Sequence, residues 1–160
     1  MKWIYGRQDW KTLERGLENC YLLTNGLGGF SSLTMTGAVA RNDHSVFMSC
    51  TKAPNHRINM IHRMKEELDI GESKYVLSTQ EFADGTKEEG YRYLTEFSFE
   101  ILPSWRYLIN GIEIEKEIVM AQGSNQIAVN YHLKNRGQKE AALCVTPFFQ
   151  FEPKGEDLKE

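Results

Sequence analysis

The sequence lacks the features that mark several large classes of protein. Its 19 Lys and Arg residues stand against 22 Asp and Glu residues, so the net charge is −3 and there is no basic surplus for binding a nucleic-acid backbone. No apolar run approaches the roughly 18 residues of a membrane-spanning helix, and no signal peptide follows Met1. We therefore expect a cytoplasmic protein that binds neither nucleic acid nor membrane.

Cysteine and metal-binding patterns are also sparse. The three cysteines, Cys20, Cys50 and Cys144, form an odd and widely spaced set, which is a poor disulfide framework. Their apolar or small neighbours favour free, buried thiols in a reducing compartment. No two of the four histidines have the spacing of metal ligands, and there is no Cys-x-x-Cys motif. We expect neither a metal nor a cofactor.

Motifs for catalysis are missing as well. The chain has no Gly-x-Ser-x-Gly nucleophile elbow and no Gly-Lys-Ser/Thr phosphate loop. Glu66 and Glu67 cannot form the facing pair of a glycosidase, because adjacent residues on a strand point to opposite faces. The row of acidic residues at 113, 115 and 117 is most simply the solvent face of a strand. The sequence therefore offers no catalytic residue.

What the sequence does contain is alternation of apolar and polar residues, the pattern of strands with one buried face. The alternation is clearest over residues 97–101, 112–120 and 127–133, with Lys116 interrupting the apolar row. Asn110-Gly111 predicts a hairpin, because both residues tolerate positive φ. Further strands are expected at residues 20–24, 30–36, 44–51, 75–79, 106–109 and 141–151. This pattern predicts an all-β fold, an antiparallel two-sheet β-sandwich.

Two segments are candidates for helix. Asp9 could N-cap a short helix that ends at Gly16. Residues 58–68 fit a helix or a strand, and we favour the strand. Pro103 and Pro147 should lie at strand ends, edges or bulges, because proline cannot donate a hydrogen bond to a sheet.

The length of the chain indicates one domain. With 160 residues it is long enough for one hydrophobic core and short for two, and it shows no repeat, linker or low-complexity tract. We expect residues 1–160 to form a single β-sandwich domain, with residues 152–160 as a loose polar tail.

The most distinctive segment is Asn25-Gly26-Leu27-Gly28-Gly29. Three glycines in four positions permit positive φ and a close approach of the backbone. A nucleotide loop is disfavoured, because a strand and not a helix is expected to follow. Two interpretations remain open: a tight structural turn between strands, and a turn that also lets a ligand or partner domain approach.

Trp105 and Tyr107 are the best pair for a sugar platform, since they lie on the same side of one predicted strand. Aromatic ring faces suit the CH faces of sugars, but most aromatic residues in a β domain belong to the core. Both interpretations stay open at this point.

The segment YLLTNGLGGFSS, residues 21–32, closely resembles the opening of the N-terminal domain of bacterial and archaeal glycogen debranching enzymes. Later segments resemble the same domain in the same order: Arg41 with His44, then residues 57–68, 103–107, 115–120 and 129–133. Ser45 replaces the glycine expected after His44, and residues 148–151 replace an Arg-Asp-His-like phrase. The family domain runs some tens of residues further, which leaves open that this chain lacks the last strands.

The resemblance implies a supersandwich of the kind that precedes the (α/α)6 barrel in glucoamylase-like enzymes. The parent enzyme would hydrolyse α-1,6 branch points in glycogen-like glucans with carboxylates of the barrel, so this chain alone is expected to be inactive. It would engage the α-glucan and pack on the barrel domain, in cis or in trans, with its oligomeric state open. The candidate substrate-binding residues are Asn25, Gly26, Gly28, Gly29, Arg41, His44, Trp105 and Tyr107. The alternative is a structural or protein-interaction β-sandwich without sugar binding.

Overall fold

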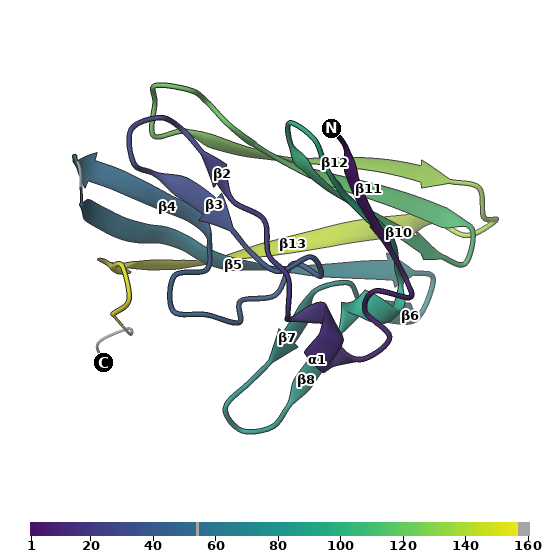
Figure 1. Ribbon diagram of the computed structural model, residues 1–160. Helices are drawn as coiled ribbons and strands as arrows, with labels where there is room; N and C mark the ends of the chain where they lie inside the picture. The colour runs from purple at the N-terminus through teal and green to yellow at the C-terminus, as the bar shows by residue number, and fades with distance from the viewer. Residues whose placement is uncertain (54, 157–160) are drawn as a thin grey trace.

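The computed structural model describes residues 1–53 and 55–156, and these residues form two facing antiparallel sheets (Figure 1). One sheet has the order β1–β9–β10–β11–β12, and the other has the order β13–β5–β4–β3–β2 with β6 also paired to β5. The strands of the first sheet are β1 (Trp3–Gly6), β9 (Leu94–Phe99), β10 (Pro103–Ile109), β11 (Ile112–Met120) and β12 (Ile127–Asn135). The strands of the second are β2 (Leu23–Thr24), β3 (Phe30–Ser32), β4 (Ser45–Lys52), β5 (His56–Ile70), β6 (Ser73–Val76) and β13 (Ala141–Pro153). The predicted all-β sandwich is confirmed.

Smaller elements lie against the second sheet, on the side away from the first (Figure 1). They are the helix α1 (Leu13–Gly16), the short strand pair β7 (Thr79–Glu81) and β8 (Lys87–Glu89), and the 3-10 turn η1 (Gly90–Arg92). Within β4, residues 45–50 are all buried.

The alternation seen in the sequence decides which side chains enter the core. On β11, Ile112, Ile114, Ile118 and Met120 are buried while the odd-numbered residues between them are more exposed. The predicted hairpin joins β10 to β11 through Asn110 at φ +48° and Gly111 at φ +81°. Local pattern and turn chemistry therefore set this part of the sandwich.

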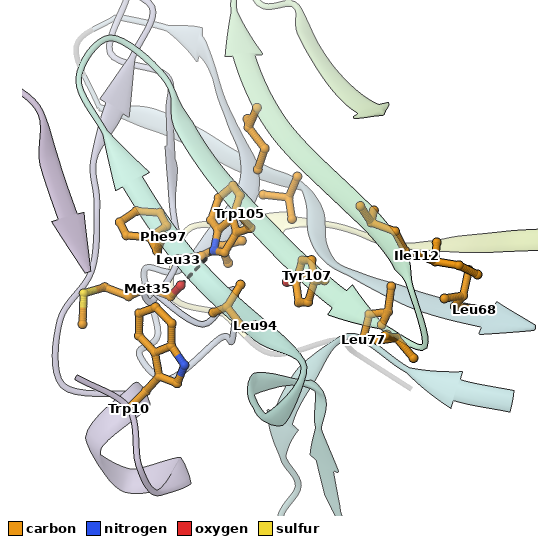
Figure 2. Close-up of a cluster of buried hydrophobic side chains, with 14 of the residues drawn as sticks. Trp10, Leu33, Met35, Leu68, Leu77, Leu94, Phe97, Trp105, Tyr107 and Ile112 are labelled. Atoms are coloured by element: carbon orange, nitrogen blue, oxygen red, sulfur yellow. Dashed lines mark hydrogen bonds between the residues drawn. The ribbon is translucent and has the colours of Figure 1, made fainter. Parts of the chain in front are cut away.

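Aromatic side chains fill the centre between the sheets (Figure 2). The ring centroid of Trp105 lies 5.4 Å from that of Tyr21 and 5.2 Å from that of Phe97. Each buried large apolar side chain contributes roughly 1.5–3 kcal/mol relative to its exposed state.

A buried ion pair crosses the core and accounts for the interruption of the apolar row on β11. Lys116 donates to the Glu66 carboxylate of β5, and both side chains are almost wholly buried. The Tyr131 hydroxyl of β12 donates to the same Glu66 oxygen at 2.8 Å, and the Lys116 ammonium lies 5.3 Å from the centre of the Trp105 ring. The ion pair therefore joins the two sheets across the core.

The helical segments differ from the sequence-based prediction in one place. The favoured strand at 58–68 is confirmed within β5. The short helix is capped by Thr12, whose hydroxyl accepts from the Arg15 N–H, and not by Asp9. The Asp9 carboxylate instead accepts from the Gly6 N–H at 2.8 Å and closes the turn after β1.

Several strand boundaries were also predicted wrongly. The strand expected at 75–79 is split, because β6 pairs with β5 whereas β7 pairs with β8. The strand expected at 30–36 ends at Ser32, and Ile101 is 78% exposed beyond the end of β9. Strands β1 and β8 were not predicted.

The chain end and the cysteines also depart from expectation. Residues 152–153 belong to β13, and the Lys154 N–H donates to the Arg57 carbonyl, so this part of the predicted tail is held to the sheet. The rest of that tail, 157–160, lies outside the described residues. Cys50 is buried, as expected, but Cys20 and Cys144 are exposed.

Candidate functional site

The glycine segment forms the turn between β2 and β3, and Asn25 organises it. The Asn25 side-chain oxygen accepts from the N–H groups of Leu27 and Gly29, both at 3.0 Å. Its amide nitrogen donates to the Ser124 carbonyl at 2.9 Å and to the Asn125 side-chain oxygen at 3.0 Å. Since Ser124 and Asn125 lie in the turn between β11 and β12, Asn25 joins the two sheets.

The glycines of this turn are required by the backbone. Gly26 and Gly28 have φ of +77° and +94°. A Cβ on Gly29 would lie 2.8 Å from the Asn25 amide nitrogen and 3.0 Å from the Met48 carbonyl oxygen. The structural-turn interpretation of the segment therefore accounts for all its unusual residues.

Gly28 and Gly29 also border a shallow hollow of about 300 Å³. Arg57 donates from Nε to the Gly28 carbonyl at 2.7 Å, and its guanidinium lies over the Phe30 ring. Arg57 is thus used by the turn itself, and the second cation of the lining, Lys154, lies 3.8 Å from the Asp43 carboxylate.

Trp105 and Tyr107 are core residues and not a sugar platform. Figure 2 shows both rings inside the sandwich, and Trp105 is 0% exposed. The Trp105 indole N–H donates to the Met35 carbonyl at 2.9 Å, and burial raises the pKa of Tyr107 well above its usual value. Neither ring has a face open to a sugar, because the odd positions of β10 point between the sheets.

His44 is likewise buried, at 1% exposed, and shapes a loop instead of facing solvent. Its Nδ1 accepts from the Ala40 N–H at 3.1 Å, which leaves the proton on Nε2. Arg41, which follows Ala40 in this loop, donates from its guanidinium to the Glu18 carbonyl at 3.1 Å. His44 therefore holds the loop that carries Arg41.

This loop borders a cavity of about 630 Å³, which we call the outer cavity. Its walls come from the loop before β4, from β5, from β7 with its turn, and from the end of β13. Its lining includes Ala40, Arg41, Asn59, His62, Gln80, Phe82 and Gln150. Of the predicted site residues, the structure brings only Arg41 to this cavity.

Side-chain amides fix the walls of the outer cavity. The Asn59 amide nitrogen donates to Gln150 Oε1 at 2.9 Å and to His62 Nδ1 at 3.1 Å, and Asn59 Oδ1 accepts from the Ser45 hydroxyl at 2.8 Å. Gln80 exchanges two hydrogen bonds with the backbone of Val39, at 2.9 and 3.0 Å. The lining is therefore held rigidly before any ligand arrives.

His62 is neutral at pH 7. Burial lowers its pKa below the usual 6.5, and the neighbouring Arg63 lowers it further. Arg63 itself pairs with Glu88 at 2.9 Å and lies between the rings of Phe82 and Phe148. Its charge is therefore satisfied away from His62.

No sequence motif marks the outer cavity, because the side chains of Asn59, Gln150 and His62 come together only through strand pairing. Within residues 1–53 and 55–156 no group of three or more His, Cys, Asp or Glu side chains could hold a metal ion. In the same part of the chain no helix has the length and apolar character to cross a membrane.

Residues 19–160 match the family model described as glycogen debranching enzyme N terminal. The chain belongs to this family. No curated protein and no solved structure matches the chain. The family relationship suggested by residues 21–32 is thus confirmed, and the glycogen debranching N-terminal domain is an antiparallel β-sandwich in this chain.

Proposed function

We propose that this chain is the non-catalytic N-terminal domain of a glycogen-debranching-type glycoside hydrolase, which engages α-glucan and packs on a catalytic (α/α)6 barrel in cis or in trans. The observation that carries the glucan half is the outer cavity, whose polar lining is held in place by amides. Its volume of about 630 Å³ is within the range of small-molecule sites. Family membership supplies the substrate class.

Electrophoresis through glycogen-containing gels tests the glucan half. We expect the folded chain to be retarded by glycogen and not by a β-linked glucan, with a dissociation constant of about 1 mM. The same sample should release no glucose from branched dextrin. Equal migration in all gels would contradict glucan engagement, and glucose release would contradict a non-catalytic role.

An exposed aromatic pair on β13 supports the packing half. Phe149 is 54% exposed and Phe151 is 60% exposed, and their parallel rings lie 5.6 Å apart. Apolar surface of this kind usually becomes covered by a partner. We expect a catalytic domain of the family, added in trans, to co-sediment with this chain, and Phe149→Ser with Phe151→Ser to weaken that association.

The same aromatic pair supports the alternative, a protein-interaction β-sandwich without sugar binding. Concentration-dependent self-association in sedimentation velocity, together with no retardation by glycogen, would favour this alternative. A monomer that glycogen retards would exclude it.

A further inference from the structure

We propose that the outer cavity is the glucan-binding site of this domain and that the ring N–H at Nε2 of His62 is its central hydrogen-bond donor. The inference rests on the proposed function, which names the ligand class but no location.

The hydrogen bond to Asn59 defines the proton position on His62. An amide nitrogen can only donate, so Asn59 Nδ2 at 3.1 Å makes His62 Nδ1 an acceptor. The neutral ring then carries its proton on Nε2. Because Nδ1 is occupied and the ring lines the cavity, Nε2–H is the polar group that His62 has left for a ligand.

A chain of hydrogen bonds positions this donor. The backbone carbonyl of Glu156 accepts from Gln150 at 2.8 Å, Gln150 accepts from Asn59, and Asn59 donates to His62. Asn59 and Gln150 are thus positioning residues, tied by the pairing of β5 with β13. A donor already held in place loses little conformational entropy when a ligand binds.

The charges around the cavity favour a neutral ligand. Arg41 is the cation of the lining, and Glu81 and Glu156 also line the cavity. A phosphate-bearing ligand would meet these carboxylates, whereas sugar hydroxyls can donate to the second lone pairs of the amide oxygens and accept from His62. Phe82, at the cavity wall, adds apolar ring surface for the CH groups of a sugar.

Calorimetric titration of maltohexaose into the full chain and three variants tests the proposal. His62→Phe keeps a flat ring but removes the donor, and should weaken binding about tenfold. His62→Gln restores an N–H and should bind within about threefold of the parent chain. His132→Gln, on β12 of the other sheet, is the matched control and should bind unchanged.

Ala40→Trp provides an independent test should His62→Phe fail to fold. Ala40 is exposed and lines the cavity, so a large ring there should occupy space that a ligand needs. Loss of binding in Ala40→Trp, with His132→Gln unchanged, supports the proposal. Unchanged binding in both Ala40→Trp and His62→Phe overturns the location but leaves glucan engagement standing, whereas no binding by the parent chain overturns both.

Discussion

Asn25 shows how one buried side chain can account for a distinctive sequence motif. It is completely buried, and its four hydrogen bonds join the turn between β2 and β3 to the turn between β11 and β12. Asn25→Ala leaves the buried Gly29 N–H without its partner, so we expect a loss of roughly 2–4 kcal/mol in the free energy of unfolding. Urea denaturation measures it, with the exposed Asn130→Ala as control; equal losses in the two variants would contradict this role.

Gly28 tests the same turn through its backbone. At φ +94° a branched side chain is strained, so Gly28→Val should destabilise the domain by roughly 1–3 kcal/mol. Gly6→Val is the matched control, since no atom lies within 4 Å of a Cβ at Gly6 and its φ is not positive. A melting temperature of Gly28→Val equal to that of the parent chain would argue against strain in the turn.

His44 predicts how stability depends on pH. Burial lowers its pKa below the usual 6.5; Asp43 opposes this shift and Arg41 adds to it. Below pH 6.5 the unfolded chain therefore binds the proton more readily, and the free energy of unfolding falls until the pH reaches the folded-state pKa. Denaturation between about pH 7.5 and pH 5.5 should show this decrease, and His44→Gln should make it shallower. An identical slope in both proteins would assign the pH dependence to other groups.

At the scale of elements, one ion pair joins β5 to β11 across the core between the two sheets. Lys116→Met leaves the Glu66 carboxylate buried without its cation, which should cost roughly 3–5 kcal/mol. Adding Glu66→Leu removes the orphaned charge and should recover most of that loss. Guanidinium denaturation of both variants measures the coupling, and a single variant as stable as the parent chain would contradict it.

The sequence predicts best the elements whose buried side chains follow a local apolar pattern or whose turns carry characteristic residues. Residues 44–51 and 112–120 and the Asn110-Gly111 hairpin carry apolar rows or turn chemistry that can be recognised directly. β1 and β8 escape prediction because their residues are mostly exposed or half-buried. The division of residues 75–79 likewise follows from a change of pairing partner, from β5 for β6 to β8 for β7, and not from local pattern.

The candidate site is less predictable than the fold. Arg41 was found through the family resemblance, and it lines the outer cavity. Asn59 and Gln150 lie 91 positions apart and meet through strand pairing, so no spacing motif marks them. The sequence left two interpretations of Trp105 open, a core residue or part of a sugar platform. The structure shows that Trp105 lies on the buried side of β10 and belongs to the core.

At the scale of the whole molecule, the sandwich separates a packed interior from a polar outer cavity. The distinctive motif, the aromatic cluster and the buried ion pair all serve the joining of two sheets. The sugar engagement that we propose therefore depends on the outer cavity, which is built from the loop that His44 holds and from β5 and β13.

One NMR titration tests this account most directly. Backbone amide signals of the full chain are followed while a branched α-dextrin is added, and the anomeric proton signals of the dextrin are recorded in the same sample. We predict saturable shifts that cluster at residues 40–42, 59–62 and 80–82, while the α-1,6 signals of the dextrin stay constant. Shifts absent from these segments, or a decline of the α-1,6 signals, would contradict a non-catalytic glucan-engaging domain.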